Sequence, residues 1–186
     1  MKILVICQYY YPEEFQINDI CEGLTQRGHK ITVLTGLPNY PTGVIPRDYK
    51  NGHKRDEIIN GVHVIRASEI PRRKGIIGLG MNYISYVIFA SLKALRLQKN
   101  FDVIYVYQLS PVFMAVPGII LKKFLKKKLY LYCCDLWPES VKAMHIKNSS
   151  FIFKIVKGIS SFIYRRCDCI GVQAMAFYEY FTHTHK

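Results

Sequence analysis

The stretch CCDLWPES, residues 133–140, joins an acidic side chain to an indole ring at the end of an apolar run. Asp135 follows LYLYCC directly, and Trp137 and Glu139 come within four further positions. A carboxylate that is near solvent but shielded by an aromatic neighbour can act as a base or accept a hydrogen bond from a hydroxyl group. For Trp137 and Glu139 the simpler alternative is structural, because an indole packs well and a glutamate stabilises the first turn of a helix. We predict that Asp135 is catalytic, with Trp137 and Glu139 as candidate binding residues.

A second polar group follows the first apolar run, in the segment CQYYYPEEFQIND at residues 7–19. Tyrosine rings with carboxylates suit a site that stacks on a sugar and binds its hydroxyl groups, which makes Tyr10, Glu13 and Glu14 candidate binding residues. The glutamates have an alternative role in the first turn of the following helix. Asn18 lies on that helix, where it either binds ligand or faces solvent. The segment lacks the glycines of a dinucleotide site, which argues against a dehydrogenase or a methyltransferase.

A third group ends the run DVIYVYQ at residues 102–108. Gln108 is a candidate binding residue at this position. Ser110 stands before Pro111, so that the simplest role for its hydroxyl group is to cap the next helix.

Six apolar runs alternate with helical patterns along the chain, and they must position these side chains. Runs that are apolar on both faces indicate strands of a parallel sheet that helices cover on both sides, so we predict an α/β, Rossmann-like, doubly wound fold. Ligands of such sheets bind outside the carboxyl ends of the strands, where all three polar groups should lie. The predicted strands are 2–7, 30–35, 61–68, 102–108, 129–135 and 168–173, and the predicted helices are 14–27, 78–98, 111–127, 151–166 and 174–181.

One connection is much longer than the usual two to six residues of such folds. Residues 36–60 contain three prolines and three glycines with mixed charge, and they follow the second predicted strand. The segment is either a surface insertion or a binding loop.

Composition limits the class of protein. The 186 residues are 50% hydrophobic, which suits one globular domain, and 26 Lys and Arg against 13 Asp and Glu give a net charge of +13. This charge favours a polyanionic partner such as nucleic acid, phosphates or anionic lipid. The apolar run after Lys2 is too short for a secretory signal, so we expect a cytoplasmic protein. We read the six cysteines as reduced core thiols and assign no metal or cofactor.

Several motifs together resemble the amino-terminal half of bacterial glycosyltransferase family 4 enzymes. They are YYYPEEFQINDICEGLTQRGHKITVLTGLPNYPTG (9–43), FDVIYVYQLSP (101–111), DLWPES (135–140) and FIYRRCDCIGVQ (162–173). The closest resemblance is to the subfamily that adds fucosamine-type sugars during O-antigen, capsule and colanic acid synthesis. It covers nearly the whole chain. It implies a GT-B fold, of which residues 1–186 would form the single acceptor-side domain.

The resemblance also implies a reaction and its partners. The reaction is the retaining transfer of a sugar from a nucleotide-sugar to a hydroxyl group of a lipid-linked or growing glycan, without a metal ion. The paired glutamates of the donor-binding domain have no counterpart after the sixth strand, so we expect that domain to be absent and this chain alone to be inactive. Asn39 and Tyr40 match the motif LPNYP and join the binding residues. Relatives often carry Gln or His at the position of Cys134.

Basic and apolar stretches predict contact with a membrane. Arg72, Arg73 and Lys74 precede the uncharged segment 75–92, which must contain the helix between the third and fourth strands, so we favour a buried or interface-lying helix over a spanning one. The lysines within residues 122–128 and the basic face of the predicted helix 151–166 would suit binding to the headgroups of anionic lipids. We expect a peripheral protein at the inner face of the cytoplasmic membrane, without a specific nucleic acid partner. The rival hypothesis is a non-enzymatic, basic Rossmann-like module that binds anionic lipid or nucleic acid.

Overall fold

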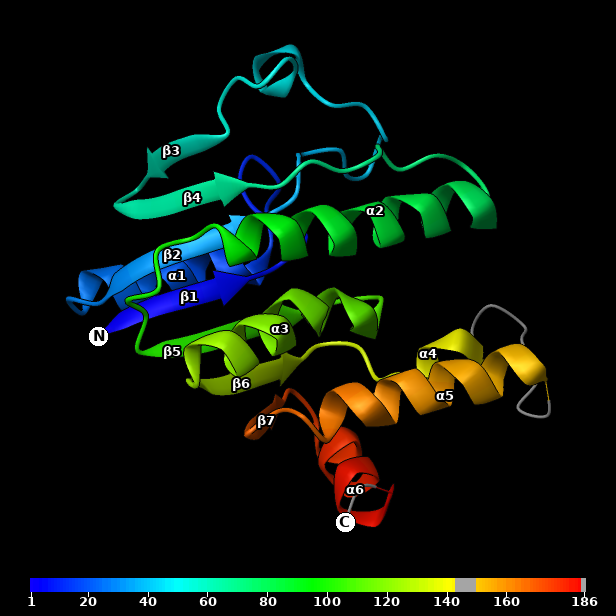
Figure 1. Cartoon of the computed structure of the whole chain (residues 1–186). Coiled ribbons are helices and arrows are strands. Elements are labelled where there is room, and N and C mark those ends of the chain that lie inside the picture. Colours follow the sequence, from blue (N-terminus) through cyan, green and yellow to red (C-terminus); the bar gives the residue numbers. More distant parts are fainter. Residues whose placement is uncertain (143–149, 185–186) are drawn as a thin grey trace.

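One sheet organises the molecule. The computed structural model describes residues 1–142 and 150–184, and in them seven strands pair in the order β3-β4-β2-β1-β5-β6-β7 (Figure 1). Every neighbouring pair is parallel except the antiparallel pair β3–β4. The strands are β1 (Lys2–Ile6), β2 (Lys30–Thr35), β3 (Asp56–Ile59), β4 (Val62–Arg66), β5 (Val103–Gln108), β6 (Lys128–Cys133) and β7 (Cys169–Val172).

Helices cover both faces of the sheet because successive side chains of a strand point to opposite sides. Ile3 and Val5 pack in the core cluster that contains Ile17 of α1, whereas Leu4 and Ile6 pack in the cluster under α2 and α3. The helices are α1 (Gln16–Gln26), α2 (Ile76–Leu95), α3 (Val116–Leu125), α4 (Glu139–Lys142), α5 (Phe151–Tyr164) and α6 (Met175–Thr184), with 3-10 turns η1 (Arg47–Tyr49) and η2 (Val112–Ala115).

The predicted Rossmann-like, doubly wound fold is confirmed. Its six parallel strands, counted along the chain, lie in the order third, second, first, fourth, fifth, sixth. The strand order reverses between β1 and β5, and ligands of open α/β sheets bind in the crevice outside the carboxyl ends at such a reversal.

The prediction that residues 36–60 form one irregular connection is wrong in part. The segment contains η1 and the edge strand β3, whose pairing with β4 makes a hairpin. Strand β3 has the sequence DEII and buries none of its residues fully. Because β3 has no apolar run, the sequence pattern did not predict a strand here. Charged residues are common on edge strands, where they protect against aggregation.

Helix α2 is half covered by the protein. Tyr86, Ala90 and Ala94 are buried against the domain, whereas Ile77, Ile84 and Ile88 are exposed. Within the described residues this is the one helix long and apolar enough to cross a membrane, judged by length and composition, with 22% of its apolar window buried. The predicted helix 111–127 begins as the 3-10 turn η2 before α3.

The cysteine prediction needs one correction. All six thiols are free, and Cys7, Cys21 and Cys133 are buried as expected. Cys169 is exposed, because it opens the short edge strand β7, which has a neighbour on one side within the described residues.

Candidate functional site

The loops that follow β1, β2, β5 and β6 meet at the carboxyl edge of the sheet. The backbone N–H of Gly36 donates to the carbonyl oxygen of Gln8 at 3.0 Å, and that of Cys134 donates to the carbonyl of Gln108 at 2.9 Å. These bonds tie neighbouring loops together in pairs. Side chains from distant parts of the sequence therefore share one rim, as parallel strands require.

Asp135 lies in a cleft of about 460 Å³ on this rim. The side chain is half-buried. Its Oδ2 accepts a hydrogen bond from the indole Nε1 of Trp137 at 3.3 Å, and its Oδ1 accepts one from the hydroxyl of Ser140. The cleft is lined by Ile76, Leu79, Gly80, Tyr83, Ser110, Asp135, Trp137 and Ser140.

The residues around Asp135 hold it in place from three elements. The indole of Trp137 is also 3.0 Å from the Oγ of Ser110, and its backbone N–H donates to the Tyr164 hydroxyl at 3.1 Å. Gln108 donates from Nε2 to the carbonyl oxygen of Asp135 at 2.9 Å. Gln108 is fully buried, so it orients the Asp135 backbone from beneath the cleft and does not line it. Its Oε1 has no hydrogen-bond partner among the described residues.

Arg72 and Tyr83 connect the cleft to the loop after β2. The Arg72 guanidinium lies 5.5 Å from the ring centre of Tyr40. Burial raises the pKa of the Tyr83 hydroxyl, the Arg72 charge lowers it, and the negative charge of Asp135 raises it further. Tyr40 is 44% exposed, and its ring also packs against Tyr9 and Phe15. The predicted residues Asp135, Trp137 and Tyr40 are thus neighbours of one rim, with Arg72 and Tyr83 between them.

Glu13 and Asn39 hold the loop after β2 from beneath. Glu13 is buried, and its Oε1 accepts hydrogen bonds from the backbone N–H groups of Asn39 at 2.8 Å and Tyr40 at 2.6 Å. Burial raises the pKa of the Glu13 carboxyl, against the effect of these two bonds. Asn39 is also buried, and its Oδ1 accepts from the backbone N–H of Arg72 at 2.9 Å. Both side chains therefore position the residues of the rim.

Glu69 is the centre of this buried polar network. Its carboxylate accepts hydrogen bonds from the side-chain amides of Asn39 at 2.6 Å, Gln8 at 3.1 Å and Asn82 at 3.3 Å. Glu69 is buried, and burial raises its pKa well above the ordinary value. Gly36 packs so closely that an added Cβ would lie 2.5 Å from Glu69 Oε1.

Four predicted binding residues lie away from the cleft. Tyr10 is 1% exposed and packs in the core with Ile17 and Cys21. Asn18 is buried on the inner face of α1 and donates to the Glu13 carbonyl at 2.9 Å. Glu14 is exposed beside a separate hollow of about 500 Å³. Glu139 opens α4, and its charge raises the pKa of Tyr180, second to burial.

Sequence reasoning missed Arg72, Tyr83 and Glu69. A signal existed for Glu69, since it follows the strand predicted at 61–68, as Gln8 follows the first strand. No local signal identified Tyr83, because it is one of many apolar or aromatic residues of α2. Arg72 was assigned to a basic cluster with Arg73 and Lys74, whereas its backbone and side chain both contact the loop after β2.

The fold is similar to that of two solved GT-B glycosyltransferases. The E. coli trehalose-6-phosphate synthase bound with UDP-2-fluoro glucose aligns with 98% of this chain at 11% identity and a TM-score of 0.58. The calicheamicin glycosyltransferase CalG4 aligns with 89% of it at 15% identity and a TM-score of 0.50. This chain spans 42% of the length of each. At these identities the likeness concerns the fold. Neither a family model nor a curated protein sequence matches the chain.

Proposed function

We propose that this chain is the acceptor-binding domain of a retaining glycosyltransferase. In this proposal it presents a hydroxyl group of a lipid-linked or growing surface glycan to a nucleotide-sugar that a second, donor-binding domain holds. The finer assignment, to fucosamine-type transfer in O-antigen or capsule synthesis, rests on the motifs LPNYP and DLWPES. The observation that carries the proposal is the cleft in which a half-buried carboxylate, Asp135, faces an opening on the carboxyl rim.

Asp135 would orient the acceptor hydroxyl group and accept its proton. During transfer the acceptor oxygen bonds to the anomeric carbon, and the bond from that carbon to the diphosphate of the nucleotide breaks. Trp137 and Ser140 donate hydrogen bonds to the two carboxylate oxygens, which restricts the rotation of the carboxyl group. Such positioning of a reacting group lowers the activation free energy. Within the described residues no Lys or Arg forms an ion pair with Asp135, so the carboxylate keeps capacity for a hydroxyl donor.

Rings and polar groups around the cleft suit a sugar. Tyr83 and the exposed ring of Tyr40 offer apolar faces, and Ser110 and Arg72 offer polar groups at their sides. Pockets of this kind, mostly apolar with a few fixed polar groups, are typical of small-molecule sites.

Binding of a glycan to the chain as it stands tests the proposal. Saturation-transfer NMR with short oligosaccharides should show contact with the protein, and Asp135→Asn should weaken it. Asp48→Asn is the matched control, because Asp48 is an exposed aspartate of the 36–60 segment. Equal binding by both variants, or no glycan contact at all, would reject the proposal. Tight, steeply salt-dependent retention of DNA or RNA would instead favour the rival nucleic-acid module.

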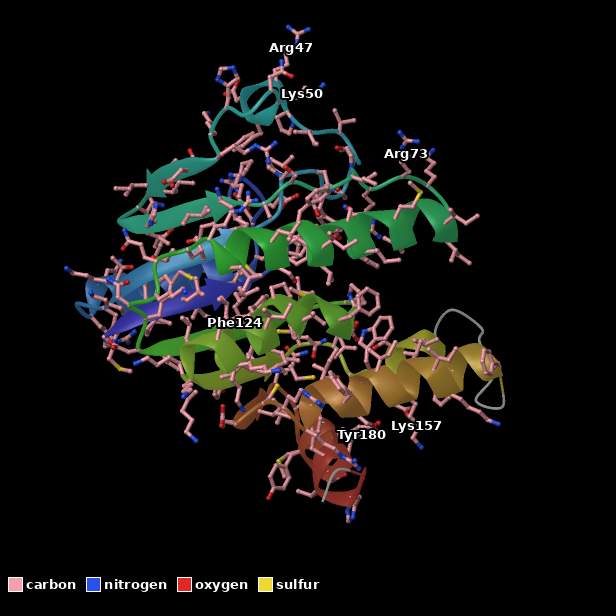
Figure 2. All side chains as sticks on the ribbon, viewed as in Figure 1. Arg47, Lys50, Arg73, Phe124, Lys157 and Tyr180 are labelled. Carbon is pink, nitrogen blue, oxygen red and sulfur yellow. The ribbon has the colours of Figure 1, made fainter. Side chains whose placement is uncertain are left out.

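We further propose that the domain lies on the inner face of an anionic membrane. Two helices expose apolar rows, Ile77, Ile84 and Ile88 on α2, and Phe151 and Ile155 on α5. Basic residues flank these rows, with Arg73 on the segment that leads to α2 and Lys157 on α5 (Figure 2). An apolar face bordered by Lys and Arg is the usual pattern of an interfacial helix. Vesicles containing phosphatidylglycerol should carry the protein in a flotation assay, and Ile84→Glu should abolish flotation, whereas Ile58→Glu on β3 should not.

A further inference from the structure

Four basic side chains surround a pocket between the β3–β4 hairpin and the carboxyl-terminal part of α2. Arg66 ends β4, Arg55 precedes β3, and Lys93 and Arg96 belong to the end of α2. The pocket has a volume of about 430 Å³, and among the described residues that line it there is no aspartate or glutamate. Figure 1 shows this hairpin on the edge of the sheet, above the end of α2 that leads to β5.

Arg66 is the buried base of the pocket. Its side chain is fully buried, and Nη2 donates to Glu57 Oε1 at 2.8 Å, while the guanidinium lies 4.8 Å from the ring centre of Tyr49. Its Nε and Nη1 have no hydrogen-bond partner within the described residues. A guanidinium group stays charged in a protein, so buried N–H groups without an acceptor are costly. Unsatisfied groups of this kind often mark the place of an ion or a water molecule.

The other three basic residues have no carboxylate partner within residues 1–142 and 150–184. Arg55 is half-buried, and its Nη1 lies 3.3 Å from Ser68 Oγ, whereas Lys93 and Arg96 form no ion pair in the described part of the chain. Burial, and next the charge of Arg66, lower the pKa of Arg55. Like charges held close together repel each other, and a bound anion would offset that repulsion.

The chemistry of the walls suits a phosphate group. Guanidinium groups bind phosphate oxygens through paired N–H donors, and lysine adds a mobile charge. Phe89 and Leu92 add an apolar wall to the same pocket. We propose that the pocket formed by Arg55, Arg66, Lys93 and Arg96 binds a phosphate group, carried either by an anionic lipid or by a dissolved molecule.

This site is separate from the cleft around Asp135. The cleft is lined by α2 residues 76–83 and the basic pocket by residues 89–96, which places the two about 20 Å apart along the helix at 1.5 Å per residue. The inference therefore goes beyond the proposed transferase function. Loss of phosphate binding leaves glycan binding intact, and the two proposals fail separately.

Titration with inorganic phosphate tests the site directly. In the ¹⁵N-labelled chain the Nε–Hε signals of Arg55 and Arg66 should shift as phosphate is added, and the shift should saturate. Sodium chloride of equal ionic strength is the control and should not produce this shift. The double variant Lys93→Ala/Arg96→Ala should weaken binding at least about tenfold, which corresponds to about 1.4 kcal/mol. Both substituted residues are near the surface, so the fold should be kept.

The matched control removes the same charge elsewhere. Arg27→Ala/Arg47→Ala, which changes two exposed arginines at the end of α1 and on η1, also lowers the net charge by two, and phosphate binding should change by less than about twofold. Equal weakening in the two double variants would mean that the overall charge attracts phosphate, and the proposal would be overturned. The absence of a saturable shift would overturn it as well.

A lipid arm distinguishes the two sources of the phosphate. Phosphatidylcholine vesicles that contain phosphatidic acid should carry the wild-type chain and the Arg27→Ala/Arg47→Ala variant better than the Lys93→Ala/Arg96→Ala variant if the group is a lipid headgroup. If flotation is the same for both variants while inorganic phosphate still separates them, the phosphate comes from a dissolved ligand. Either result with the expected titration supports a phosphate site.

Discussion

Glu69 and Asp135 both follow a parallel strand at the carboxyl edge of the sheet, yet their carboxylates have different surroundings. Glu69 is buried and accepts hydrogen bonds from three side-chain amides, those of Gln8, Asn39 and Asn82. Asp135 is half-buried, accepts from Trp137 and Ser140, and faces a cleft. The first carboxylate has its acceptor capacity used by the protein, whereas the second keeps capacity for a ligand.

The comparison separates two roles of an acidic residue that follows a parallel strand. A position at the end of a strand brings a side chain to the rim. Burial and the number of hydrogen-bond donors around it decide whether the side chain has a structural role there or can bind a ligand. Glu13 and Asn39 belong to the Glu69 group, since their polar atoms form hydrogen bonds with backbone groups of the loops after β2 and β4. The substitutions below test this division, in order of decreasing expected effect.

Glu69→Ala should cost the most stability. Removing the carboxylate takes one hydrogen-bond acceptor from each of three buried side-chain amides, which keep one other acceptor each, and we expect the free energy of unfolding to fall by about 3 kcal/mol. Urea denaturation measures the change. Glu14→Ala is the control, because Glu14 is exposed, and it should alter stability by less than about 0.5 kcal/mol. Similar stabilities for the two variants would mean that the Glu69 network is not structural.

Asp135→Asn should affect activity and leave stability nearly unchanged. In a polypeptide that unites this domain with a donor-binding domain, turnover should fall at least about a hundredfold if the carboxylate accepts a proton. The free energy of unfolding should change by less than about 1 kcal/mol, because the amide oxygen still accepts a hydrogen bond. Asp48→Asn serves as the control for turnover. Unchanged turnover in Asp135→Asn would place Asp135 with Glu69 as a structural carboxylate.

Arg72→Ala should weaken glycan binding by a smaller factor. The substitution removes the guanidinium beside Tyr40 but keeps the backbone N–H that donates to Asn39. A cation–π contact at an exposed site contributes about 1 kcal/mol, so we expect the dissociation constant for the glycan to rise approximately fivefold. Calorimetry with an oligosaccharide measures it, with Arg47→Ala, an exposed arginine of η1, as the control (Figure 2). A stability loss equal to that of Glu69→Ala would instead make Arg72 part of the structural network.

The pH dependence of stability gives the smallest effect. The pKa of Glu13 is raised by burial above its ordinary value of 4.5, so the folded protein holds this proton more tightly than the unfolded chain does. Stability from this group is present below pH 4.5 and is lost as pH rises through the pKa of the folded state. Glu13→Gln keeps an oxygen for the two backbone donors and should flatten this slope. An unchanged slope in denaturation experiments from pH 4 to 7 would show that Glu13 does not contribute to it.

Much of the fold could be predicted from local patterns. The six apolar runs became the six parallel strands, because fully buried strands are apolar on both faces and need no distant information to be recognised. Strand β3 was not predicted, since its four residues, DEII, form neither an apolar run nor an alternating pattern, and it lies on an edge of the sheet. The orientation of the three adjacent tyrosines also escaped. Tyr9 is buried at the rim and Tyr10 is buried in the core, and the sequence YYY does not show which ring takes which position.

The sequence by itself determined the six parallel strands, the longer helices and the edge of the sheet near which Asp135, Tyr40 and Gln108 lie. Only the tertiary structure decided which polar side chains use their hydrogen-bonding groups within the protein. Gln8 reaches Glu69 across 61 positions and Asn82 across 74. Periodicity describes neighbours along the chain, whereas burial and hydrogen-bond supply depend on segments that meet after folding, so that the roles of Glu69, Arg72 and Tyr83 could be assigned from the structure alone.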